Sequence, residues 1–211
     1  IFVIDQRNNK IRKITPSGLV STFAGDGVER KVDGQGTSAS FDDPTNIVID
    51  SSDNIYVTEY RSSSIRKITP SGVVSTFAGT GSRGQTDANG TSASFDRPYG
   101  MVFDADSNMY VADYGNDIIR KITPSGYVTT YAGLADDDDL VNGSRLNARF
   151  DGPVGITIDS AGNLYVSEYG NKTVRKIDTN GNVTTVADGF SYPYGITIND
   201  NDTVFVSDYT D

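Results

Sequence analysis

The sequence predicts an all-β fold made of four-stranded antiparallel sheets that repeat along the chain. The tetrad Ile-Arg-Lys-Ile begins at Ile11, Ile65 and Ile119 and recurs as Val-Arg-Lys-Ile from Val174, so the copies are offset by 54, 54 and 55 residues. A fixed period of this length is typical of repeat architectures. Short β-branched and aromatic runs separated by turn residues indicate that each copy consists of strands.

The copy at residues 98–133 shows the unit most clearly. It contains four strand-forming runs separated by tight turns, at 101–103, 109–112, 118–122 and 127–131. All seven prolines lie either in the turn between the third and fourth runs or just before the first run, at Pro16, Pro70, Pro124, Pro44, Pro98, Pro153 and Pro193. Because proline cannot donate a ladder hydrogen bond, these positions support a four-stranded meander with those boundaries.

Apolar residues occupy both faces of the third strand of each copy. Ile119 and Ile122 fall on opposite faces, which indicates that neighbouring sheets cover both sides, as in a β-propeller. We therefore predict one propeller domain over residues 1–211, with about 4.25 blades in a chain that is a piece of something longer. The expected blades are 1–25 (partial), 44–79, 98–133, 153–188 and 193–211 (partial), and the inserts are 26–43, 80–97 and 134–152.

Composition narrows the function classes. The 18 basic and 28 acidic residues give a formal charge of −10, which disfavours a nucleic-acid partner. The chain has no cysteine and no histidine, so disulfides, thiolate chemistry and imidazole-based catalysis are excluded for this sequence. No apolar run approaches the length of a membrane span, and we expect no membrane insertion.

Several motifs resemble the NHL-repeat family of β-propellers. They are Pro-x-Gly, the Asp-x-x-x-Asn turn, Tyr-Val-x-Asp/Glu-Tyr-Gly-Asn, and Ile-Arg-Lys-Ile with Pro-Ser-Gly. Inserts that end in Ala-x-Phe-Asp-x-Pro are similar to those of bacterial and extracellular members, including the teneurin type. The resemblance implies a six-bladed ring, completed by the same chain or by an assembly, and a family known mainly for binding. Fold alone does not decide function.

The first blades depart from the repeat pattern. Asn46 replaces the glycine of Pro-x-Gly, and residues 61–64 read Arg-Ser-Ser-Ser where the third and fourth blades have Gly-Asn. Each replacement is still a turn former. The first blades therefore need not present the same surface as the later ones.

Two charged sets recur with the repeat. Carboxylates end the second strand at Asp5, Glu59, Asp113, Glu168 and Asp208, and the third strand carries the pairs Arg12-Lys13, Arg66-Lys67, Arg120-Lys121 and Arg175-Lys176. A metal ring and a phosphate-binding band are the functional interpretations. Identical repetition favours a structural role, in which the basic heads meet the carboxylates and the aliphatic stems cover neighbouring blades.

The residue after each first-strand proline is the candidate for ligand binding. These residues are Thr45, Tyr99, Val154 and Tyr194, and in a propeller they would lie at the mouth of the central channel. Their variation between copies is consistent with ligand binding, and equally with neutral variation at positions that have no function.

Two further patterns are weaker candidates. The run Asp136, Asp137, Asp138 and Asp139 offers oxygen ligands for Ca²⁺ but lacks EF-hand spacing, so a solvated loop is favoured and no cofactor is predicted. Asn-x-Ser/Thr sequons, which are glycosylation candidates in a secreted protein, occur at Asn89, Asn142, Asn171, Asn182 and Asn201.

These observations favour a non-catalytic module that presents its loop face and inserts to a protein or glycan, outside the cell or at its surface. Incomplete blades at both ends add self-association as an expectation. The alternative is a metal-dependent lactonase-like hydrolase, which needs unlike carboxylate and amide ligands converging in the channel.

Overall fold

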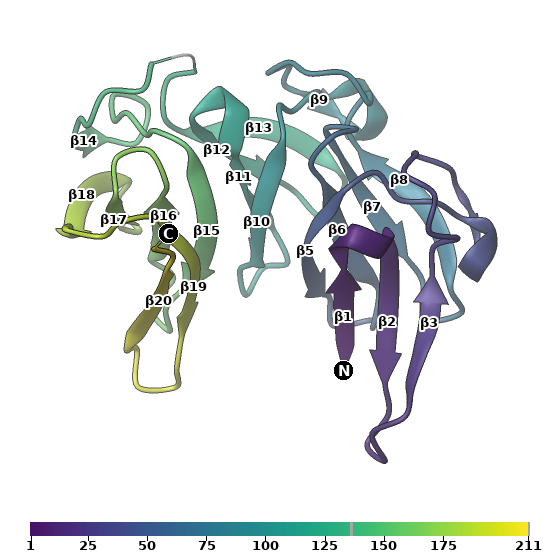
Figure 1. Cartoon of the computed structure of the whole chain (residues 1–211). Helices are drawn as coiled ribbons and strands as arrows, with labels where there is room; N and C mark the ends of the chain where they lie inside the picture. The colour runs from purple at the N-terminus through teal and green to yellow at the C-terminus, as the bar shows by residue number, and fades with distance from the viewer. Residues whose placement is uncertain (136, 211) are drawn as a thin grey trace. The chain divides into compact units, whose positions relative to one another are not determined.

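The computed structural model describes residues 1–135 and 137–210, in two compact units, Ile1–Pro98 and Tyr99–Asp211 (Figure 1). Each unit is built from antiparallel sheets, which confirms the all-β prediction. No sheet closes on itself within the described ranges. The single ring, its blade number and the one-domain boundary stay predictions.

The first unit holds two sheets. One contains β1 (Phe2–Asp5), β2 (Lys10–Ile14) and β3 (Val20–Ala24) in sequence order. The other has the order β4-β8-β7-β6-β5, with β4 (Gly34–Gln35), β5 (Pro44–Ile49), β6 (Ile55–Glu59), β7 (Ser64–Ile68) and β8 (Val73–Ala78). The remaining elements lie in loops and inserts: η1 (Gln6–Asn8), η2 (Gly36–Ser38), β9 (Ala88–Asn89) and η3 (Gly90–Ser92).

The second unit repeats the same meander. In its first sheet the neighbours run β10 (Pro98–Phe103), β11 (Met109–Asp113), β12 (Ile118–Ile122) and β13 (Tyr127–Ala132), with η4 (Tyr114–Asn116) after β11. The next has the order β14-β18-β17-β16-β15, with β14 (Gly143–Ser144), β15 (Pro153–Ile158), β16 (Leu164–Glu168), β17 (Thr173–Ile177) and β18 (Asn182–Ala187). A two-stranded ribbon of β19 (Pro193–Ile198) and β20 (Val204–Asp208) follows.

A phenylalanine from an insert completes the core of each unit. Phe41 packs with apolar residues of both sheets of the first unit, and Phe150 does the same for the β11–β12 and β16–β17 strands of the second; both rings are fully buried. Burial of a large aromatic side chain contributes about 1.5–3 kcal/mol. The inserts are therefore part of the packed frame as well as loops between sheets.

The Asp-x-x-x-Asn turns are closed by their own side chains. Asp50 Oδ1 accepts the backbone N–H groups of Ser52 and Asn54 at 2.9 Å, and its Oδ2 accepts the Tyr56 hydroxyl at 3.2 Å. Asp159 makes the same set of bonds in the second unit. Desolvation raises the pKa of each carboxyl, but these hydrogen bonds outweigh it and leave the pKa lowered.

Candidate binding site

The recurrent arginines form buried ion pairs with the recurrent carboxylates. Arg66 lies 2.8 Å from Glu59, and Arg120 and Arg175 lie 3.1 Å from Asp113 and Glu168, with every one of these side chains fully buried. The expected pairing is confirmed for the arginines. The lysines beside them do not follow it, because Lys67 and Lys176 lie over the rings of Tyr56 and Tyr165, 5.4 and 5.3 Å from the ring centres. In the first sheet the pair of Arg12 with Asp5 is longer, at 3.6 Å, and partly exposed.

The arginines also hold the inserts, which the sequence did not reveal. Arg66 donates to the backbone oxygens of Ser40 and Val32 at 3.0 Å, and its guanidinium lies 5.5 Å from the centre of the Phe41 ring. Arg175 makes the equivalent contacts with its own insert, 5.1 Å from the centre of the Phe150 ring.

Burial raises the pKa of Glu59 and of Glu168, while the facing arginine and the hydroxyl donors of the loop oppose that rise. With each guanidinium enclosed between a carboxylate, backbone oxygens and a phenylalanine ring, these pairs form a frame. They leave no open face for a ligand.

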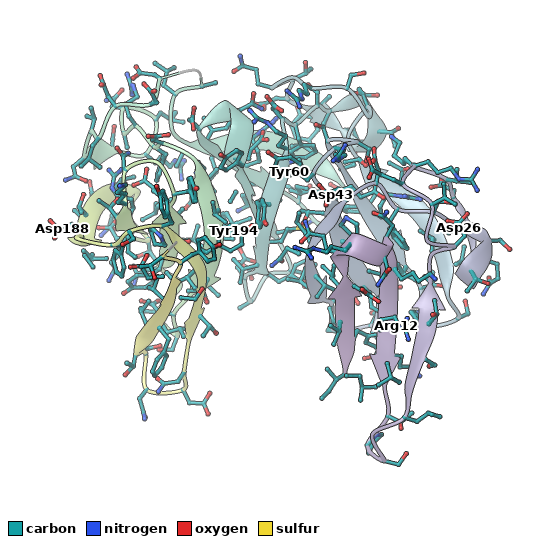
Figure 2. All side chains as sticks on the ribbon, in the orientation of Figure 1. Arg12, Asp26, Asp43, Tyr60, Asp188 and Tyr194 are labelled. Atoms are coloured by element: carbon teal, nitrogen blue, oxygen red, sulfur yellow. The ribbon has the colours of Figure 1, made fainter. Side chains whose placement is uncertain are left out.

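The structure separates the four predicted channel-mouth residues into different surroundings. Val154 is only 2% exposed, and Thr45 shares a 3.0 Å hydrogen bond with the Thr58 hydroxyl. Tyr99 and Tyr194 meet edge to face, with ring centres 5.3 Å apart. Tyr194, at the start of β19, keeps 41% of its surface exposed (Figure 2).

Tyr194 lines a hollow of about 460 Å³ in the second unit, here called the tyrosine hollow. Its walls are Tyr169, Tyr194, Ser207, Asp208 and Tyr209. Tyr169 is 36% exposed and Tyr209 62% exposed, so both rings present surface to a ligand. Tyr169 also stacks on Tyr192, with ring centres 4.9 Å apart and planes at 24°.

Asp208 and Ser207, two polar side chains of the tyrosine hollow, are bonded to backbone groups. Asp208 Oδ1 accepts the N–H groups of Ser191 at 3.0 Å and Tyr192 at 2.7 Å. Ser207 Oγ accepts the N–H of Gly195 at 2.9 Å and donates to its carbonyl at 3.3 Å. The hollow therefore offers aromatic faces and one held carboxylate.

A second hollow, of about 420 Å³, lies in the first unit and is polar. Its walls are Gln6, Arg7, Asn9, Glu29, Asp43 and Arg61. Arg61 lies 3.0 Å from Glu29 and 3.6 Å from Asp43, and Gln6 donates to Asp43 at 2.8 Å. Much of its charge is therefore satisfied internally.

The acidic run does not gather as a metal site in the described part of the chain. Asp137 accepts a hydrogen bond from Arg149 Nε at 2.6 Å, whereas Asp136 lies outside the described residues. No group of three or more acidic side chains is placed to hold a metal ion among the residues described. Nor does any described helix have the length and apolar character needed to cross a membrane.

The sequon asparagines differ in what their amides do. Asn171 and Asn182 donate from Nδ2 to Glu168 and Asp178, at 3.2 and 3.0 Å, so a glycan on that nitrogen would disturb these bonds. Asn142 uses its Oδ1 to accept from Arg175 at 2.8 Å. Asn89 and Asn201 have exposed side chains.

Known proteins resemble this chain in sequence. Residues 150–177 match the family model described as NHL repeat. Protein SUPPRESSOR OF QUENCHING 1, chloroplastic, of Arabidopsis thaliana is 28% identical over 77% of the chain and 16% of its own length. NHL repeat-containing protein 2 of Homo sapiens is 28% identical over 80% of the chain and 25% of its own length. The chain thus spans a quarter or less of these relatives.

Solved β-propeller-like structures align with nearly the whole chain. A streptogramin B lyase has a TM-score of 0.69 at 18% identity, covering 98% of this chain and 58% of that one. A gluconolactonase from Xanthomonas campestris has a TM-score of 0.68 at 16% identity, covering 98% and 65%. A catalytically inactive histidine-to-alanine variant of a Staphylococcus aureus virginiamycin B lyase has a TM-score of 0.57 at 18% identity, covering 98% and 73%. At these identities the likeness establishes the fold alone.

The relatives correct the predicted location. The Arabidopsis protein is chloroplastic by name, and NHL repeat-containing protein 2 does not point outside the cell. The extracellular or cell-surface prediction, drawn from sequons that are common in any Asn-, Ser- and Thr-rich chain, is therefore wrong. The glycosylation candidates lose the context on which they depended.

Proposed function

We propose that this chain, since it belongs to the NHL-repeat family, is a non-catalytic binding module that holds its ligand in the tyrosine hollow. The ligand is either a small molecule or a side chain of a partner protein. The frame is that of a β-propeller, which presents its loops rigidly and leaves function to the side chains at their ends.

The observation that carries this proposal is that the tyrosine rings of the hollow are exposed, whereas Asp208 and Ser207 are bonded to backbone groups. Tyr169, Tyr194 and Tyr209 expose ring surface, which supplies apolar contact and stacking for a ligand. Asp208 and Ser207 are already bonded to backbone groups, which supports a role for both in shaping the hollow.

The alternative is an enzyme, because a lyase and a gluconolactonase share the fold. Replacement of one histidine accompanies the loss of activity in the virginiamycin B lyase variant, and this chain of 211 residues contains no histidine. These 211 residues therefore do not themselves supply a histidine for lyase chemistry of the same kind. A lactonase would need a metal held by converging oxygen ligands.

Two measurements test the proposal. Amide NMR spectra would be recorded while choline, its neutral isostere 3,3-dimethylbutan-1-ol, or glucose is added. At least one probe should shift signals around the hollow, and Tyr194→Ala should abolish those shifts. Thr45→Ala is the matched control, because Thr45 holds the same repeat position in the first unit.

Hydrolysis of gluconolactone would be followed in parallel with added Ca²⁺ or Zn²⁺. We expect the uncatalysed rate. A metal-dependent rate above it, removed by a chelator, would overturn the non-catalytic proposal in favour of the enzyme.

A further inference from the structure

We infer that Asn142 is a site of spontaneous modification, at which its side-chain amide is converted to a carboxylate by way of a cyclic imide formed with Gly143. The inference goes beyond the proposed binding function and does not depend on it. It is carried by three features: the glycine that follows Asn142, the two donors that hold its amide oxygen, and an amide nitrogen that no neighbour holds.

The reaction begins when the backbone nitrogen of Gly143 attacks the side-chain Cγ of Asn142. The new C–N bond closes a ring, and the amide nitrogen leaves as ammonia with the proton of the attacking N–H group. Water then opens the imide, so that an amide and a water molecule give a carboxylate and ammonia. Because glycine has no side chain, its nitrogen is the least shielded nucleophile that can follow an asparagine.

The donors around Asn142 stabilise the charge that develops during this attack. The tetrahedral intermediate carries its negative charge on Oδ1, and that oxygen accepts from the Arg175 guanidinium at 2.8 Å and from the Thr185 hydroxyl at 3.3 Å. Fixed donors aimed at a developing oxyanion lower the barrier to acyl transfer. Arg175 is fully buried and paired with Glu168, so the charged donor is in place before the reaction starts.

Neither the leaving group nor the nucleophile is enclosed. Within the described residues, Nδ2 of Asn142 makes no hydrogen bond, and both Asn142 and Gly143 are exposed to solvent. Gly143 lies in β14, a strand of two residues that pairs with β18 at the edge of its sheet. A short edge strand opens locally at low cost in free energy, and such opening frees the backbone nitrogen for attack.

The first unit shows that the repeat accommodates the product. Asp33 holds the repeat position of Asn142, and it accepts from Arg66 at 2.7 Å and from the Thr76 hydroxyl at 3.2 Å. Arg66 thus pairs with a carboxylate of the insert as well as with one of its own sheet. Conversion of Asn142 to aspartate would give Arg175 the same two partners, through a charge-assisted hydrogen bond.

The sequence contains two other Asn-Gly pairs, and they lack these donors. They are Asn89-Gly90 and Asn180-Gly181, and neither side-chain oxygen accepts a hydrogen bond in the part of the chain that the structure describes. Both asparagines are exposed, as Asn142 is. The three sites therefore share the glycine and the exposure, and they differ in the donors.

The test follows conversion at all three sites in the whole chain at mildly alkaline pH, folded and in urea, by peptide mapping with mass spectrometry. Urea removes the donors, so the ratio of the folded to the unfolded rate isolates the effect of the structure. We expect this ratio to be about tenfold higher at Asn142 than at Asn89 and Asn180, as two hydrogen bonds to the oxyanion would provide. A ratio at Asn142 that is no higher than at the other two sites overturns the inference.

A variant tests the donors directly. Loss of Arg175 destabilises the fold, so we choose Thr185→Val, which removes one donor and keeps the shape of the side chain. It should slow conversion of Asn142 in the folded chain by about threefold to tenfold, the equivalent of one hydrogen bond. Thr76→Val is the matched control, because Thr76 makes the same bond to Asp33 and should leave the rate at Asn142 unchanged. Equal rates at Asn142 in the two variants also overturn the inference, because the reaction then does not use the donors.

Discussion

The two hollows share one position of the repeat and differ in chemistry there. Gln6 lines the polar hollow and Tyr169 lines the tyrosine hollow, and each follows the carboxylate that ends a second strand. Asp43, before a first-strand proline, also lines the polar hollow, whereas its counterpart Tyr192 stacks on Tyr169 and is not itself a wall of the tyrosine hollow. At these positions the second unit has tyrosine where the first has an amide and a carboxylate, so the variable residues decide what each hollow can bind.

The frame of buried ion pairs is built in the same way in both units. Arg66 and Arg175 are enclosed in the same way, by a glutamate, insert carbonyls and a phenylalanine ring. These contacts tie each insert to its sheet. Any difference in binding between the units should therefore come from the residues that line the hollows. Equivalent changes to the buried ion pairs should lower the free energy of unfolding by similar amounts in both units.

The largest expected effect is loss of a frame arginine. Arg66→Met and Arg175→Met should each lower the free energy of unfolding by about 3–5 kcal/mol, because each leaves a buried carboxylate without its partner. Urea denaturation measures this loss. Arg12→Met, at the partly exposed pair, is the control and should cost less than about 1 kcal/mol. Equal costs at Arg12 and Arg66 would contradict a shared buried frame.

The strands and turns could be predicted from sequence because their signals are local. Proline positions, Asp-x-x-x-Asn turns and β-branched runs lie within single units, and each meander forms as they indicate. The arginine contacts with the inserts could not be predicted, because Arg66 reaches Ser40 and Val32, which lie 26 and 34 residues away, through backbone oxygens that carry no sequence signal.

The sequence predicted only some of the residues that line the tyrosine hollow. Tyr194 was selected because it varies among the copies, whereas Tyr169 was missed because tyrosine at that position looked like repeat consensus, as at Tyr60 and Tyr114. The available signal was the departure of Gln6 from that consensus. It marks a position that the frame does not require, and hence one that a binding surface can use.

A smaller effect is expected where β15 approaches β19. A Cβ on Gly155 would lie 2.5 Å from the backbone oxygen of Tyr194 and 2.7 Å from Ser167 Oγ, so Gly155→Ala must displace β19. We expect a loss of about 1–3 kcal/mol in unfolding free energy, measured by urea denaturation. Ligand binding at the hollow should weaken, because Tyr194 moves.

Gly195→Ala is the matched control for Gly155→Ala. A Cβ there would meet only Ser207 Oγ, at 3.0 Å, and a rotating hydroxyl can yield. Asn46 stands at the same repeat position in the first unit, so the fold of the repeat does not require glycine there. A Gly155→Ala variant as stable as Gly195→Ala would show that β19 has room to move.

The smallest expected effect is the acid response of the paired turns. Asp50 and Asp159 have lowered pKa values in the folded chain, so their contribution to stability is present above the ordinary aspartate pKa of 3.8 and is lost as the pH falls below it. Urea denaturation at pH 6 and pH 3 should show a shallower loss for Asp50→Asn and for Asp159→Asn than for the parent. The two variants should lose similar amounts of unfolding free energy between pH 6 and pH 3, because the turns make the same bonds in both units. If only one variant showed the shallower loss, the turns of the two units would differ in stability as well as the residues that line the two hollows.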